Sequence, residues 1–196
     1  MLRNLHLPSL LGCILLLSGC LYDHPPSGPT QSIDTWLIGQ WATKDKAGRE
    51  FTAVMAPSSS SHYHLSIAGK GSSPREFDGW ISRVDDFSIL TLKSLKEGSD
   101  FGKYSLYHYE LLSPGAPPPG GIGVTRIRIS ELQLDESCRS LDSYRLRAAI
   151  RLALKDGSLL APYDVVAARK EKGVEIPGSI VWSKTGGVTL RGETFQ

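Results

Sequence analysis

Short segments in which apolar and polar residues alternate recur along most of this 196-residue chain. Residues 62–69, HYHLSIAG, place Tyr63 and Leu65 on one side of an extended backbone and His62 and His64 on the other. An alternation with a period of two indicates a strand with one buried face, because successive side chains of a strand point to opposite faces. A series of such segments with turn residues between them predicts an antiparallel sheet.

The sheet predicted from this alternation is large for the length of the chain. Strands are predicted at residues 49–56, 62–69, 75–84, 87–95, 103–112, 124–129, 163–171, 179–185 and 187–193. A sheet of about nine strands in a small protein usually curls or closes, because closure removes the exposed edges. Residues 113–123, SPGAPPPGGIG, are predicted to form an exposed loop, since proline lacks the N–H donor and glycine is entropically costly in a strand.

Two periods compete in residues 140–157, SLDSYRLRAAIRLALKDG. The apolar residues alternate as in a strand, whereas three basic residues fall at the i, i+4 and i+8 positions of a helix. Leu, Ala and Arg are strong helix formers, Ser140 or Asp142 can cap the start, and Gly157 fits just past the end. We therefore predict a helix here. The predicted fold is mainly β (β-rich α+β): an antiparallel meander that forms a small barrel or half-barrel with one helix packed against it.

The first twenty residues carry a targeting pattern. Arg3 precedes the apolar run LLGCILLL, residues 10–17, which is less than half of the ~20 residues that a membrane-spanning helix needs. The run ends in Leu17-Ser18-Gly19-Cys20, which resembles the lipobox of bacterial lipoproteins. The resemblance implies that the Cys20 thiol takes a diacylglyceryl group, that the chain is cleaved before Cys20, and that the new amino group is acylated.

The lipobox resemblance divides the chain into three parts. Residues 1–19 would be a lipoprotein signal peptide, residues 20–34 the lipidated cysteine and a flexible, proline-marked tether, and residues 35–196 a single β-rich domain. In the bacterial lipoproteins that this pattern resembles, an Asp after the cysteine is a signal for retention at the inner membrane. Leu21 stands there in this chain, so the resemblance implies the outer membrane. With Cys13 removed and Cys20 acylated, Cys138 has no disulfide partner within the chain.

A second, shorter motif lies at Gly39-Gln40-Trp41, which resembles the G-x-W signature of lipocalins and of lipocalin-like bacterial lipoproteins. The resemblance implies a short helical turn that leads into the first strand and a tryptophan that plugs the closed end of the barrel. Asp34 or Thr35 would cap that turn, Trp36 would lie in it, and Arg191 would lie over the tryptophan. A core tryptophan at the start of any meander is the alternative explanation.

Aromatic and histidine side chains supply the candidate binding residues. The candidates for a ligand-stacking surface are Trp41, Trp80, Tyr104, Tyr107 and Tyr109. Aromatic residues on strands also serve as cross-strand packing. The candidate metal ligands are His62, His64 and His108, although no carboxylate is clearly placed to complete the site and solvent-facing histidines are the alternative. We predict no bound cofactor.

Several functional classes lack support. There is no G-x-S-x-G elbow, no phosphate-cradling glycine motif and, at a net charge of +2, no basic stripe for nucleic acid. We predict a non-enzymatic lipoprotein on the periplasmic face of the outer membrane, held by acyl chains on Cys20, that binds a small apolar ligand or an envelope protein. The alternatives are a structural or assembly accessory lipoprotein without a ligand pocket, and a hydrolase whose site is spread over distant loops.

Overall fold

The computed structural model describes residues 21–44, 49–95, 97–98, 100–112, 126–169, 188–190 and 193–195. Its strands are β1 (Gly39–Lys44), β2 (Glu50–Pro57), β3 (His62–Gly69), β4 (Arg75–Val84), β5 (Phe87–Ser94), β6 (Tyr104–Leu112), β7 (Arg126–Leu132), β8 (Leu160–Arg169), β9 (Val188–Leu190) and β10 (Glu193–Phe195). The helical elements are two 3-10 turns, η2 (Thr35–Leu37) and η3 (Glu136–Cys138), and one α-helix, α1 (Ser143–Asp156).

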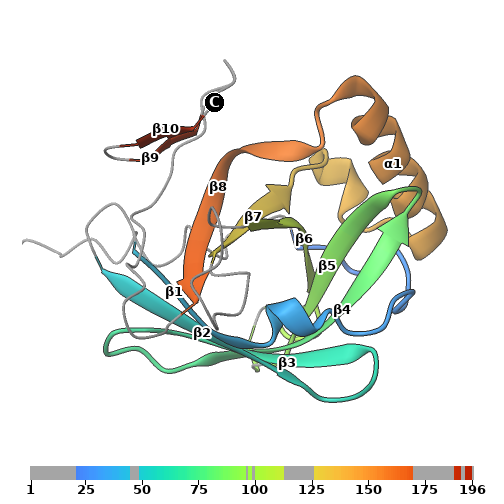
Figure 1. The fold of residues 1–196 in the computed structure, drawn as a ribbon. Helices are drawn as coiled ribbons and strands as arrows, with labels where there is room; N and C mark the ends of the chain where they lie inside the picture. Colours follow the sequence, from blue (N-terminus) through green and yellow to red (C-terminus); the bar gives the residue numbers. More distant parts are fainter. Residues whose placement is uncertain are drawn as a thin grey trace, which may run out of the picture.

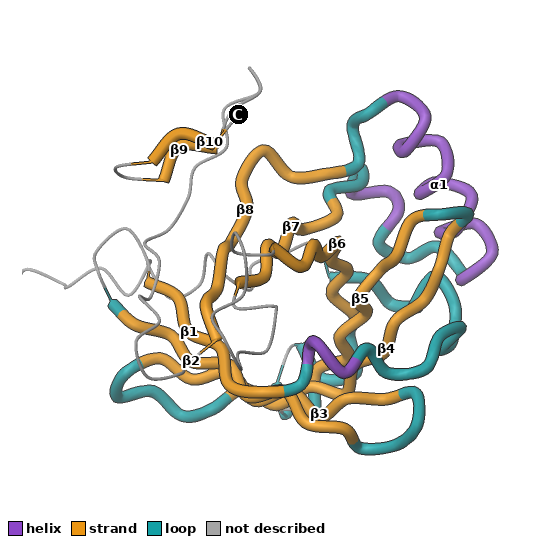
Figure 2. The backbone as a smooth tube through the Cα atoms, viewed as in Figure 1, coloured by secondary structure: helices purple, strands orange, loops and turns teal. Residues whose placement is uncertain are grey.

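Strands β1 to β8 form a closed antiparallel barrel in which each strand pairs with the next along the chain. The barrel closes where β8 pairs with β1, through Trp41 opposite Arg169 and Ala42 opposite Ala168. Figures 1 and 2 show the strands surrounding a common centre, with α1 outside the ring. The predicted mainly β fold, a small barrel with one helix against it, is confirmed.

The predicted strands from residue 49 to residue 112 agree closely with β2 to β6. The sequence missed β1 as a strand: the first strand was expected to begin at residue 49, yet Gly39–Lys44 pairs with β2 along all six of its residues. The predicted strand at 179–185 and the predicted proline-rich loop at 113–123 lie outside the described residues. Residues 188–190 and 193–195 form a two-stranded sheet of their own.

The alternating apolar side chains point into the barrel interior, as the period-two pattern predicts. We call the following buried residues the barrel core: Leu37, Trp41, Met55, Tyr63, Leu65, Phe77, Ile81, Leu90, Leu92, Tyr107, Ile127 and Ala167. They come from η2 and from every strand of the barrel. Burying a large apolar side chain contributes roughly 1.5–3 kcal/mol, so this set is the main source of stability.

A second cluster joins α1 to the outer face of the barrel. This helix-side core consists of Tyr22, Val84, Ile89, Leu106, Leu132, Leu134, Leu146, Ile150, Ala153 and Leu159. Because Leu146, Ile150 and Ala153 recur at helical spacing, they form the one stripe that α1 buries. A strand in contact with α1 can therefore bury apolar residues on both faces, as β5 does with Ile89 in the helix-side core and Leu90 and Leu92 in the barrel core.

The ends of α1 are set by the residues that the sequence singled out. The Asp142 carboxylate accepts a hydrogen bond from the Arg145 N–H at 2.9 Å, and Gly157 takes the left-handed conformation with φ 73°. An aspartate cap satisfies a backbone donor that the helix leaves open, and only glycine adopts positive φ without steric cost. These local signals decide the competition between the strand and helix periods in favour of the helix.

Residues 21–34, for which the sequence predicts a flexible tether, instead lie along the barrel. Tyr22 is fully buried, and its backbone exchanges two hydrogen bonds of 2.9 Å with Tyr104. Farther along, the Trp80 indole donates to the Ser27 carbonyl at 3.0 Å and the Ile33 N–H donates to the Ser60 carbonyl at 3.1 Å. The partners lie 27–82 residues away in the sequence, which is why composition alone could not reveal this attachment.

Candidate functional site

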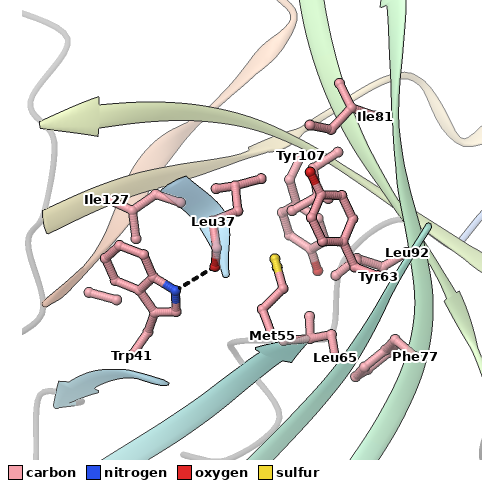
Figure 3. Close-up of a cluster of buried hydrophobic side chains, with 12 residues drawn as sticks. Leu37, Trp41, Met55, Tyr63, Leu65, Phe77, Ile81, Leu92, Tyr107 and Ile127 are labelled. Carbon is pink, nitrogen blue, oxygen red and sulfur yellow. Dashed lines mark hydrogen bonds between the residues drawn. The ribbon is translucent and has the colours of Figure 1, made fainter. Parts of the chain in front are cut away.

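One end of the barrel is closed by η2 and Trp41. The Asp34 carboxylate caps η2 by accepting a hydrogen bond from the Trp36 N–H at 3.0 Å, and Leu37 projects into the interior with no exposed surface. The Trp41 indole N–H donates to the Leu37 carbonyl at 2.9 Å, which Figure 3 shows as a dashed line. Of the two predicted caps, Asp34 rather than Thr35 thus caps the turn that leads into β1, and the tryptophan of Gly39-Gln40-Trp41 is buried.

Next to the end that η2 and Trp41 close, the barrel contains a cavity of about 130 Å³. Its lining comes from η2 and seven barrel strands: Leu37, Trp41, Ala42, Thr43, Phe51, Thr52, Ala53, Met55, Leu65, Ile67, Leu90, Leu92, Tyr107, Ile127, Ile129, Glu131 and Ala167. Figure 3 shows Met55 pointing into the space between Leu37 and Leu65. The lining is apolar apart from two threonines, one tyrosine and one carboxylate, so the cavity suits an apolar guest with few polar atoms.

The size of the cavity limits what it can hold. Sites for drug-sized ligands occupy roughly 300–1,000 Å³. An apolar cavity on the order of 150 Å³ stays dry and takes a guest the size of benzene. The barrel in this form therefore suits a small ring or a short stretch of hydrocarbon rather than a large amphiphile.

A cluster of polar groups lies at the η2 end of the barrel. The Tyr109 hydroxyl donates to the Asp34 carboxylate at 3.4 Å, and the Tyr63 hydroxyl accepts a hydrogen bond from the Asp34 N–H. Burial, with a smaller contribution from the nearby Asp34 charge, raises the pKa of Tyr63 to about 12, although the backbone hydrogen bond opposes the shift. The same two causes, burial first, raise the pKa of Tyr109 far above its ordinary value.

We expect these two phenols to make the barrel sensitive to alkaline pH. In the unfolded chain a tyrosine ionises near pH 10, whereas Tyr63 keeps its proton to about pH 12. The folded state therefore binds more protons in this window, and the free energy of unfolding should fall as the pH rises from about 10 to 12. Urea unfolding at a series of pH values measures this slope. Tyr63→Phe should make the slope shallower, because only Tyr109 then contributes, whereas Tyr144→Phe, at an 83% exposed position, should leave it unchanged. Equal slopes in the two variants would refute the assignment.

The five candidate aromatic residues divide between two faces of the barrel. Trp41 and Tyr107 line the cavity, and Tyr109 packs against the barrel core beside Asp34. Trp80 and Tyr104 lie on the outer face instead, with ring centroids 6.0 Å apart, and both contact the segment that contains Tyr22 and Ser27. The same alternation that places Phe77 and Ile81 inside already indicates that Trp80 points outward, so this signal was present in the sequence.

The three candidate metal ligands have different protein partners. His64 pairs with Glu76 at 2.7 Å, the His62 ring lies 5.5 Å from the Trp80 ring, and His108 stacks on Phe87 at 4.4 Å. Within the described ranges, no three His, Cys, Asp or Glu side chains are grouped so that they could hold a metal ion. The structure thus does not bring these histidines together as one site.

Two further predictions concern residues outside the described ranges, namely the lipobox at Cys20 and the arginine at position 191. Cys138 is described and is a free thiol, half-buried at the edge of the helix-side core. None of the helices in the described part of the chain is both long enough and apolar enough to cross a membrane. The chain matches no protein-family model, no curated protein and no solved structure.

Proposed function

We propose that this protein is a lipid-anchored lipoprotein of the cell envelope whose barrel binds a small apolar molecule. The observation that carries the ligand-binding role is the apolar cavity of about 130 Å³ above Leu37 and Trp41. A closed barrel with such a cavity has a preformed binding site, so little conformational entropy is lost when a ligand enters. The role is non-enzymatic and needs no cofactor.

The lipocalin-like part of the proposal rests on the closed end of the barrel. A 3-10 turn leads into β1, and the tryptophan of Gly39-Gln40-Trp41 lies buried over that turn with its indole bonded to Leu37. This is the arrangement that the resemblance implies. A cavity below the usual size of ligand sites favours a small guest, such as an aromatic ring or the end of a hydrocarbon chain.

The location in the envelope rests on the N-terminal pattern. The short apolar run that ends in Leu17-Ser18-Gly19-Cys20 supports cleavage and acylation at Cys20, and Leu21 after the cysteine supports the periplasmic face of the outer membrane. Two or three acyl chains on one residue hold a protein on a bilayer without help from the polypeptide, since each buried CH₂ contributes ~0.8 kcal/mol.

A benzene titration tests the cavity. Saturation with benzene at 100 times its dissociation constant would stabilise the folded protein by about 2.7 kcal/mol and raise its melting temperature. Ala53 lines the cavity, so Ala53→Leu should fill it and abolish the shift. Val54→Leu changes the next residue, which is 44% exposed, and should leave the shift intact.

Two outcomes of the benzene titration would contradict the binding role. A wild-type protein that benzene does not stabilise would favour an accessory lipoprotein without a ligand pocket. An undiminished shift in Ala53→Leu would place the bound benzene somewhere other than the cavity. Because both variants are measured in the same detergent or bilayer, partitioning of benzene into lipid affects them equally.

A further inference from the structure

The attachment of residues 21–34 to the barrel changes what an anchor at Cys20 can do. A free tether of fifteen residues would reach roughly 50 Å when fully extended, at 3.3–3.6 Å per residue. Tyr22, however, is fully buried and paired with Tyr104 through two backbone hydrogen bonds of 2.9 Å. Only the two residue steps from Cys20 to Tyr22 remain, so an acylated Cys20 lies within about 7 Å of a fixed point on the barrel.

Asp23, the residue after Tyr22, is also attached to the barrel domain. The Asp23 N–H donates to the Arg139 carbonyl at 2.8 Å, and the Asp23 carboxylate forms an ion pair with Lys103. Tyr22 is also part of the helix-side core, so moving it would open this buried apolar cluster. The point of attachment is therefore part of the folded domain and not a frayed end.

The barrel surface next to this point carries exposed apolar side chains. Phe101 is 60% exposed on the connection between β5 and β6, two residues before Lys103. Leu95, at the start of the same connection, is 41% exposed. We call Leu95, Phe101, Lys103 and Arg139 the anchor-side surface. Lys103 and Arg139 are ion-paired with Asp23 and Glu136, so the feature of this surface that suits a membrane is the exposed Phe101 ring. Aromatic rings are enriched at the headgroup level of membranes.

We infer that the barrel lies directly on the bilayer through the anchor-side surface, with Phe101 inserted at the level of the lipid headgroups. This inference rests on the proposed acylation of Cys20. The partner is the phospholipid surface that holds the acyl chains. Since the anchor leaves only about 7 Å between Cys20 and Tyr22, the domain cannot move a molecular diameter away from that surface or rotate freely over it.

A depth measurement tests the inference with the acylated full chain in vesicles of phosphatidylethanolamine and phosphatidylglycerol. In a Cys138→Ser background, Phe101→Cys carries a nitrobenzoxadiazole label, and Val54→Cys carries the same label as the matched control. Strand β2, which contains Val54, lies four strands from β6 in either direction around the barrel. We expect lipids with a nitroxide on the acyl chain to quench the label at position 101 several-fold more than the label at position 54.

A second variant tests the cause of this placement. Fifteen Gly and Ser residues inserted between Cys20 and Leu21 restore a long tether, and quenching at position 101 should fall to the level measured at position 54. Undiminished quenching would overturn the role of the short anchor. Equal quenching at the two positions without the insertion would overturn the membrane-facing surface itself, and would leave Phe101 for contact with a protein.

Flotation of the same vesicles distinguishes failure of the proposed lipid anchor from failure of the proposed contact between the anchor-side surface and the bilayer. If the protein does not float and carries no acyl group, the proposed lipid anchor fails, and this inference fails with it. If the protein floats with its acyl chains and the label at position 101 behaves like that at position 54, the anchor holds and only the inference is overturned.

Discussion

Replacing Trp41 by alanine is expected to lower the free energy of unfolding by about 3–5 kcal/mol, which is the usual cost of removing a large buried aromatic side chain. Trp41 is 4% exposed and belongs to the barrel core. The substitution removes its contacts with the lining of the cavity and its hydrogen bond to the Leu37 carbonyl, and it enlarges an existing void. Equilibrium urea unfolding followed by far-ultraviolet circular dichroism measures the change.

Two control variants give destabilisations with which that of Trp41→Ala can be compared. Trp41→Phe keeps an aromatic ring in the core but loses the indole hydrogen bond, so its cost should lie well below that of the alanine variant. Trp36→Ala changes a tryptophan that is 43% exposed in η2 and should cost much less than Trp41→Ala. A Trp41→Ala protein as stable as Trp36→Ala would show that the end of the barrel is not closed as described.

Replacing Cys20 by serine is expected to abolish completely the acylation that we propose for this chain. A serine hydroxyl cannot form the thioether to a diacylglyceryl group, so neither the first lipid nor the later amide-linked chain can be added. Metabolic labelling with a palmitate analogue measures the loss directly, and the intact mass of the wild-type chain should correspond to a start at Cys20 plus its acyl groups. Without tens of buried CH₂ groups, the mature domain would lose its hold on the membrane.

The chain offers matched cysteine controls for this experiment. Cys13→Ser changes a residue of the same apolar run, and Cys138→Ser changes the half-buried thiol near α1. Both should keep full labelling. A wild-type mass that starts at Met1 without an acyl adduct would remove the lipid anchor, the envelope location and the membrane-facing surface together.

The closed end of the barrel, the cavity and the Asp34 cluster differ in how much of each could be predicted from the sequence. The sequence predicted the turn before β1, with Asp34 or Thr35 as its cap, and a buried Trp41, because these signals are local. It did not predict Leu37, whose carbonyl accepts the indole hydrogen bond. The cavity itself was not predicted, because its lining joins residues from Leu37 to Ala167 whose approach depends on closure of the barrel. The Asp34 cluster likewise needs Tyr63 and Tyr109, which lie 29 and 75 residues away.

Residues 21–34 also make contacts with distant parts of the chain that the sequence did not predict. Its prolines and small polar residues are typical of a free tether, and nothing in residues 21–34 indicates a binding partner. The partners are groups on the folded barrel, such as the Trp80 indole and the Lys103 ammonium, that gather along one path only after β4 and β6 are in place. Composition describes what a segment can do alone and carries no information about a surface that forms elsewhere.

The sequence by itself determined strands β2 to β6, their buried faces and helix α1, but not β1, because alternation, helix capping and turn residues act within a few residues of each other. It also determined that His62 and His64 face away from the barrel core, since the period of two leaves them opposite Tyr63 and Leu65. The tertiary structure alone decided that the sheet closes around a cavity, that Tyr22 pairs with Tyr104 and that Asp23 bonds to Arg139. These are contacts between residues far apart in the chain, and their free energy depends on which surfaces folding brings together.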